Sequence, residues 1–244
     1  MKNNLLLWRA LVDTGLSIRN NLQLFSYFAL LLAVGNYVFL RLESIFSGAI
    51  FLHLAAIYVF YYLFIRVYFR KKPIFETDNF LRSIARMLII IILAFASVML
   101  LRIGFDILKL FAKSLSVFPD VYNFLAGIYA FLKSWPYTNV FLMILIFGIL
   151  MFTIFIPFFA WISTIIGIEQ SIIFSVIETK ESYAKLFLIY VTFFGLIPFI
   201  FMGFLMSMKT PLIITSIISG IYSIFQIVLY LRIYLILFPL RILK

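Results

Sequence analysis

Four polar side chains stand within or beside otherwise apolar segments of this chain: Glu169, Gln170, His53 and Arg102. Glu169 is the one ionisable residue in positions 139–177. A carboxyl group in such surroundings can pass protons or bind a cationic substrate, and Gln170 can hold it through a hydrogen bond. It can equally serve the structure alone, paired with a lysine or tyrosine of a neighbouring helix. We treat all four as candidate site residues and keep both interpretations of Glu169 open.

The supply of metal-binding side chains is small, because the sequence has one histidine, His53, and no cysteine. Metal sites draw on several histidine, cysteine or carboxylate ligands, so we expect no metal and no cofactor. His53 lies nine residues into the apolar run that begins at Ser44. We expect it to pack between helices with one hydrogen bond, and we expect Asn36 and Gln226 to form hydrogen bonds between helices as well.

Sequence motifs for catalysis are scarce. Asp13-Thr14-Gly15 has the letters of an aspartic-protease triplet. Such a protease brings two aspartates together, whereas this triplet occurs once and in a segment of helical pattern. The phosphate-binding, zinc-protease and serine-hydrolase motifs do not occur in the sequence. Enzymes that act on lipids need clustered His, Asp or Glu, so we expect that the protein is not an enzyme.

These polar residues must be positioned by helices that cross a membrane. A helix over positions 139–177 would be about 58 Å long, against a hydrocarbon core of about 30 Å, so this stretch must be interrupted. Pro157 lies near its middle and lacks the N–H that continues a helix, and we expect the break there. Across the chain 66% of residues are hydrophobic and 12% are charged, about half the charged share of a soluble domain. The predicted fold is an all-α, polytopic transmembrane helical bundle.

The number of spans depends on the stretch around Pro157. If positions 139–177 cross the membrane once, the chain has six spans. If they cross twice and the short apolar run 117–132 crosses once, it has eight, and two crossings suit the length better. We assign residues 21–244 to one transmembrane domain and residues 1–20 to an amphipathic helix in the membrane interface. The apolar positions of that helix are Leu5, Trp8, Val12 and Leu16.

Basic residues predict the orientation. The net charge is +11, but the basic residues lie mostly at the ends of apolar runs, which is the pattern of the positive-inside rule and excludes nucleic acid as the natural partner. With both termini in the cytoplasm, six spans place 14 of the 20 Lys and Arg residues inside, and eight spans place 15 inside. Seven spans divide them evenly. We therefore expect an even number of spans in the inner membrane of a bacterium, in keeping with the usage of Ile, Phe, Lys and Asn.

Three short motifs are shared with a known family. Asp13-Thr14-Gly15 is followed by Arg19-Asn20-Asn21, Ile156-Pro157 breaks an apolar stretch, and the last span closes with residues 229–234, Leu-Tyr-Leu-Arg-Ile-Tyr. Together they resemble the YciC family of bacterial inner-membrane proteins, which is similar to the membrane domain ahead of some glycerophosphodiester phosphodiesterases. The resemblance covers about half of the chain, and Phe158 replaces the glycine that usually follows the family's proline. It implies a multi-helix architecture and an inner-membrane location, and it brings no established activity.

Two functions agree with these observations. The first is a non-enzymatic membrane component of envelope or lipid homeostasis, or an accessory subunit of a membrane complex. The alternative is a small-molecule transporter or permease, with Glu169 and the Pro157 break lining the path. The expected partners are the lipid bilayer and either another membrane protein or a second copy of the chain. Polar residues from several helices around one cavity would favour transport, and a uniformly apolar interior would favour the first function.

Overall fold

The structure is a computed structural model that describes residues 6–43, 49–114, 123, 146–168, 170–208 and 210–239. In this part of the chain the regular structure is entirely helical, which confirms the predicted all-α class. The α-helices are α1 (Leu6–Asn20), α2 (Leu22–Glu43), α3 (Ala49–Tyr68), α4 (Thr77–Ser114), α7 (Pro157–Ile165), α8 (Ile172–Glu178), α9 (Tyr183–Ile189), α10 (Ile197–Ser207) and α11 (Leu212–Leu237), with π-helices over Met151–Phe155 and Tyr190–Leu196 and a 3₁₀ turn over Lys180–Ser182.

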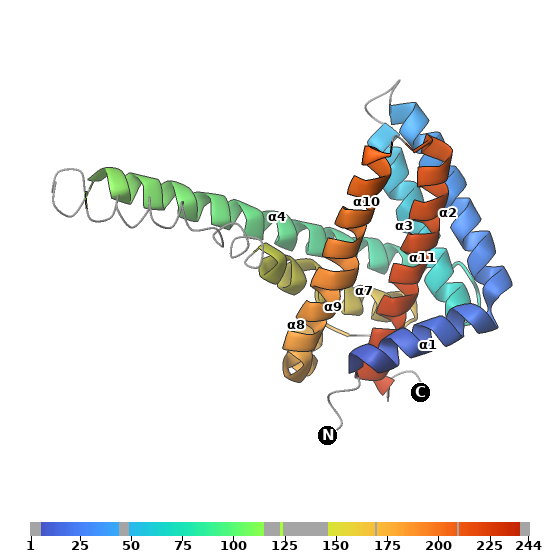
Figure 1. Ribbon diagram of the computed structural model, residues 1–244. Coiled ribbons are helices and arrows are strands. Elements are labelled where there is room, and N and C mark those ends of the chain that lie inside the picture. The colour runs from blue at the N-terminus through green and yellow to red at the C-terminus, as the bar shows by residue number, and fades with distance from the viewer. Residues whose placement is uncertain are drawn as a thin grey trace.

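The helices form a bundle with one long extension. Helices α2 and α11 pack side by side, and α1 crosses the end of this pair near both chain termini (Figure 1). Helix α4 has 38 residues, about 57 Å at 1.5 Å per residue. Its first half packs against α7, and its second half extends well beyond the other helices (Figure 1). The largest fully buried side chains belong mainly to α3 and α7, with Ile90 of α4 and Tyr234 of α11.

Six helical segments in the described residues are long and apolar enough to cross a membrane. The segments are Leu22–Leu42, Phe51–Tyr68, Thr77–Gly104, Ile146–Ile165, Lys180–Leu205 and Leu212–Leu237. Their outer faces carry exposed Leu, Ile, Phe and Val side chains, and only 6% of the most apolar window in Thr77–Gly104 is buried. Such surfaces contact lipid. The protein is a multi-pass membrane protein.

In the described part of positions 139–177, one segment is long and apolar enough to cross a membrane, Ile146–Ile165, which favours the six-span arrangement over the eight-span one. The span ends at Ile165, and α8 has seven residues, about a third of the length that a crossing requires. The apolar run 117–132, the other part of the eight-span arrangement, lies almost wholly outside the described residues.

The position of the helix break also differs from the expectation. The chain stays helical through Pro157, and Ile156 has ordinary helical angles (φ −69°, ψ −46°). A π-helix precedes Pro157, with the Ile156 N–H bonded to the Met151 carbonyl at 2.9 Å. In a π-helix the hydrogen bonds run to the fifth residue back, and this shift of pattern lets the helix continue past a proline that lacks an N–H. The helix ends instead at Ile165, just before Gly167.

Gly167 ends α7 for a conformational reason. Its φ is +79°, in the left-handed region that favours glycine. The N–H of Ile168 bonds to the Ser163 carbonyl at 2.7 Å, and the N–H of Gly167 bonds to the Thr164 carbonyl at 3.1 Å. These two bonds form the Schellman motif that closes many helices. The break therefore lies ten residues beyond the predicted proline.

The N-terminal segment is helical from Leu6, as the sequence predicts. Its small residues Ala10, Thr14 and Ser17 are buried against the bundle, and the Thr14 hydroxyl donates to the Ala10 carbonyl at 2.6 Å. The aspartic-protease triplet thus lies in a helix. Trp8 is 67% exposed, and it belongs to an apolar stripe on the outer face with Val12 and Leu16. An exposed apolar stripe suits a helix that lies in the membrane interface.

Candidate functional site

Two π-helices precede prolines in neighbouring spans. The first ends before Ile156-Pro157 and the second before Ile197-Pro198, so the same dipeptide follows each. In the second, the Ile197 N–H bonds five residues back, to the Thr192 carbonyl. The next carbonyl along the chain, that of Phe193, would need the N–H of Pro198, which does not exist. A carbonyl in the apolar interior is therefore left without a helical partner.

Helix α11 supplies the missing donors. The Tyr222 hydroxyl and the Gln226 side-chain amide both donate to the Phe193 carbonyl, at 2.6 and 2.8 Å. The expected hydrogen bond of Gln226 between helices is thereby confirmed. One turn further on, the Tyr230 hydroxyl donates to the carbonyl of Phe155, in the first π-helix. Three polar side chains spaced four residues apart lie on one face of a helix, and we call Tyr222, Gln226 and Tyr230 the α11 polar ladder.

The Phe155 carbonyl lies at the junction of the first π-helix and α7, where the hydrogen-bond pattern is irregular. The N–H of Phe159 bonds to the Ile156 carbonyl at 3.1 Å, and the Phe155 carbonyl accepts from the Tyr230 hydroxyl. Tyr230 is 2% exposed, so its hydroxyl satisfies a carbonyl that water does not reach. An unsatisfied carbonyl in an apolar interior costs several kcal/mol. The ladder therefore stabilises both irregular helices.

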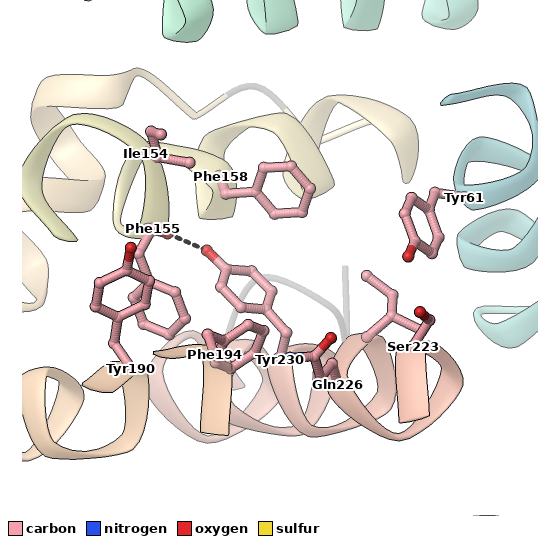
Figure 2. Close-up of a pocket in the computed structure, with 10 residues that line it drawn as sticks. Tyr61, Ile154, Phe155, Phe158, Tyr190, Phe194, Ser223, Gln226 and Tyr230 are labelled. Carbon is pink, nitrogen blue, oxygen red and sulfur yellow. Dashed lines mark hydrogen bonds between the residues drawn. The ribbon is translucent and has the colours of Figure 1, made fainter. Parts of the chain in front are cut away.

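A cavity of about 220 Å³ lies between the ladder and the π-helices. Figure 2 shows the Tyr230 side chain reaching from α11 to Phe155, with Tyr61 and Ser223 at the other end of the cavity. The lining residues are mostly aromatic, and none of them carries a formal charge: they are Tyr61, Ile154, Phe155, Phe158, Tyr190, Phe194, Ser223, Gln226, Ile227 and Tyr230. An aromatic cavity with a few oriented polar groups is typical of a ligand site. We take it as the candidate functional site.

The aromatic rings of this site pack closely on one another. The ring of Tyr230 lies 4.9 Å from that of Phe155 at an interplanar angle of 88°, and 4.6 Å from that of Phe159 at 23°. The Phe158 ring lies 4.4 Å from that of Trp161, between ring centroids. Edge-to-face and offset contacts of this kind each add about 0.5–1.5 kcal/mol beyond simple burial. The walls are therefore fixed by packing as well as by hydrogen bonds.

His53 lies elsewhere, between α2 and α3. Its Nε2 is 3.1 Å from the side-chain oxygen of Asn36, and its ring stacks on Phe39 at 4.9 Å. This contact between α2 and α3 is the hydrogen bond that we expected for both Asn36 and His53. Within the described residues, no group of three His, Cys, Asp or Glu side chains could hold a metal ion.

Arg102 and Gln170 are not among the described residues that line the aromatic cavity. Arg102 is exposed on the second half of α4. Gln170 is 2% exposed and lies between α7 and α8, where its amide donates to the Ser175 hydroxyl at 2.8 Å. Glu169 lies outside the described residues. Its neighbour Ile168 lines a different pocket, beside α4.

Sequence reasoning found Gln226 and Pro157 but missed Tyr222, Tyr230 and Ser223. A signal was present, because Tyr222, Gln226 and Tyr230 repeat every four residues in an apolar run. Such a stripe predicts one polar face on a membrane helix. Its purpose could not be read from α11 alone, since the acceptors belong to two other helices.

The fold and the site together define a polytopic α-helical membrane protein with an aromatic cavity bordered by two π-helices. No family model, no curated protein and no solved structure matches the chain. Its function must therefore be argued from its own geometry.

Proposed function

We propose that the protein is a non-enzymatic component of lipid handling in the inner membrane of a bacterium, and that its aromatic cavity holds a single apolar chain such as a fatty acyl group. The observation that carries the proposal is the chemistry of the lining. Its residues are uncharged, and the amide of Gln226 and the hydroxyl of Tyr230 already donate to backbone carbonyls. The binding free energy of a ligand in this cavity would come mainly from burial of its apolar surface. At about 220 Å³, the cavity is smaller than the roughly 300–1,000 Å³ of most small-molecule sites, which suits one slender chain.

A second candidate function is transport. The observation in its favour is that the cavity is lined by residues of both π-helices, Phe155 and Phe194 among them. Transporters often bind substrate where membrane helices are irregular. The described lining residues carry no charged side chain, which favours an apolar cargo over an ion. A carrier and a binding component differ in whether the ligand moves across the bilayer.

The cavity can be tested with a brominated medium-chain fatty acid, because bromine quenches tryptophan fluorescence at close range. The reporter is Trp161, which contacts the cavity residue Phe158, in a protein whose Trp8 and Trp135 are replaced by phenylalanine. We expect saturable quenching. Ser223→Leu places a larger side chain in the cavity and is expected to weaken binding about tenfold or more, through lost space and overpacking.

Ser207→Leu is the matched control, because Ser207 is exposed on α10, and we expect it to bind as the parent does. Ile154→Phe narrows the cavity from its partly exposed edge and gives a second test should Ser223→Leu fold poorly. Equal, non-saturable quenching in the parent and in folded cavity variants would contradict the proposal. Faster movement of the probe between the leaflets of reconstituted vesicles would assign the carrier function.

We also propose that both termini are cytoplasmic. Support comes from the charge count and from the six segments that suit an even number of crossings. The resemblance to the YciC family agrees with this location. A reporter that is active only in the periplasm is expected to stay silent when fused after Lys244. The same reporter placed between α2 and α3 should be active, and the reverse pattern would overturn the orientation.

A further inference from the structure

A groove of about 510 Å³ runs between α2 and α11, and we call it the α2–α11 groove. Its floor is buried, with residues that are 3–4% exposed: Phe25, Ala33 and Ile224. Its rim consists of exposed apolar side chains, those of Leu22 and Leu30 on α2 and of Ile217 and Ile221 on α11. No residue of the groove lines the aromatic cavity. The groove therefore opens toward the bilayer and needs an interpretation of its own.

Small side chains explain why the space between these two helices is not filled. Ala29 and Ala33 of α2 face Gly220 of α11, and a Cβ at Gly220 would lie 3.2 Å from the Ala33 Cβ. Small residues let two membrane helices approach closely, but they are too short to fill the hollow beside the contact. The larger side chains of Leu30 and Ile221 stand at its edges. The result is a narrow apolar channel on the lipid-facing side of the pair.

The length of the groove matches one leaflet of a bilayer. Its lining on α2 runs from Leu22 to Ala33, roughly 16 Å at 1.5 Å per residue. Half of the hydrocarbon core is about 15 Å thick. The candidate span begins at Leu22, so the groove extends from the membrane surface to near the middle of the bilayer. A partner helix crosses both leaflets, whereas a phospholipid acyl chain lies in one, and the length therefore favours an acyl chain.

A basic residue lies at the surface end of the groove. Arg19 follows the groove residue Ile18 at the corner between α1 and α2, and it is exposed. In the part of the chain that the structure describes, Arg19 takes part in no ion pair. Asp13 is the one acidic residue before Glu43 in the sequence, and its carboxylate pairs with Arg9 at 3.8 Å. A guanidinium group offers fork-shaped donors that match the oxygens of a phosphate.

We propose that the α2–α11 groove binds one acyl chain of an anionic phospholipid, and that Arg19 binds its phosphate group. Helix α1, which ends beside Arg19, crosses the end of the α2 and α11 pair (Figure 1). An amphipathic helix in that place lies among the headgroups, where anionic lipid attracts basic residues. The proposal does not depend on the ligand of the aromatic cavity, because different residues line the two.

The test is native mass spectrometry of the full chain in detergent. The probe is phosphatidylglycerol, and the comparison is phosphatidylcholine, whose headgroup has no net charge. We expect preferential retention of phosphatidylglycerol. Arg19→Gln should weaken its binding about fivefold, the effect of one basic residue near anionic lipid, and should weaken the binding of phosphatidylcholine less. Arg102→Gln removes the same charge from an exposed position of α4 and should change neither.

A second set of variants keeps the charge and changes the space. Ser26 lines the groove and is exposed, so Ser26→Phe should weaken the binding of both lipids about tenfold by occupying the channel. Ser207→Phe, exposed on α10, is the matched control and should bind as the parent does. Ile221→Trp and its control Ile213→Trp, both exposed on α11, repeat the comparison should Ser26→Phe fold poorly.

The remaining outcomes separate the groove from other sites and other occupants. Lysophosphatidylglycerol has one acyl chain and should bind nearly as well as phosphatidylglycerol. Ser223→Leu changes the aromatic cavity and should leave lipid binding intact; a loss in that variant but not in Ser26→Phe would overturn the proposal. Equal losses in Arg19→Gln and Arg102→Gln, or full binding by folded Ile221→Trp, would overturn it as well. So would a dimer of the parent that Ile221→Trp disrupts, because the occupant would then be a second copy of the chain.

Discussion

Arg66→Met is expected to lower the stability of the protein by about 3 kcal/mol, because it removes a buried cation from the place where three segments meet. Arg66 is 2% exposed. Its guanidinium donates to the Ile165 carbonyl at the end of α7 at 3.0 Å, to the Pro73 carbonyl, and to the Glu76 carboxylate at 3.1 Å. Methionine keeps the apolar stem and leaves all three oxygens without this donor.

The size of this loss of stability depends on how deeply the partners of Arg66 are buried. Breaking a fully buried ion pair costs about 3–5 kcal/mol, but the Glu76 side chain is 43% exposed, so we expect the lower end of that range. In a chain of this size the loss corresponds to a melting temperature lower by roughly 10 °C, which thermal unfolding in detergent would measure.

Two further variants separate the contributions of Arg66. Arg66→Met combined with Glu76→Gln should recover part of the loss, because no unpaired carboxylate is left. Arg102→Met is the matched control, since Arg102 is exposed, and its melting temperature should stay close to that of the parent. A melting temperature of Arg66→Met within a degree or two of the parent would show that the buried contacts contribute little.

The burial of Arg66 illustrates what the sequence does not reveal. An arginine at the end of an apolar run predicts a cation at the membrane surface, and this expectation is sound for Arg82, which is exposed. Arg66 stands in a similar place but bonds to the Ile165 carbonyl, 99 residues along the chain. That contact depends on how α7 packs on α3, which local pattern does not encode.

The class of fold, by contrast, follows from composition and length. Apolar runs of about twenty residues predict spans because the bilayer sets the length, and six such segments are present in the described residues. The end of α7 was predictable in principle, because a glycine near the end of an apolar run is a typical helix stop, and polar residues begin two positions after Gly167. The prediction of a helix break at Pro157 did not take into account that a π-helix lets the chain stay helical past a proline without an N–H. The α11 polar ladder is similar: its spacing is visible in the sequence, but its acceptors are not.

Helix α2 carries three small residues, Ala29, Ala33 and Gly35, and a Cβ at Gly35 would meet nothing within 4 Å. The partner of Ala29 and Ala33 is Gly220, on α11. Small residues let two membrane helices approach closely, but a single sequence does not say which of them face each other.

Gly220→Ala is expected to destabilise the contact between α2 and α11 strongly. A Cβ at this position would lie 2.7 Å from the Ala29 carbonyl oxygen, 3.0 Å from the Ala33 backbone nitrogen and 3.2 Å from the Ala33 Cβ. The two nearest atoms belong to the backbone, so no change of rotamer can relieve the clash and the helices must separate. Overpacking of this kind costs about 1–3 kcal/mol, and Gly220→Leu should prevent normal folding.

Gly203→Ala is the matched control, because a Cβ there meets nothing within 4 Å. Alanine favours a helix over glycine by up to about 1 kcal/mol, so this variant should be as stable as the parent or slightly more so, whereas Gly220→Ala should melt several degrees lower. Ala33→Gly should not rescue Gly220→Ala, because it removes the side-chain contact and leaves both backbone contacts in place. Restored stability in that double variant would show that α2 and α11 are held apart by side chains, and not by the direct approach of their backbones at Gly220.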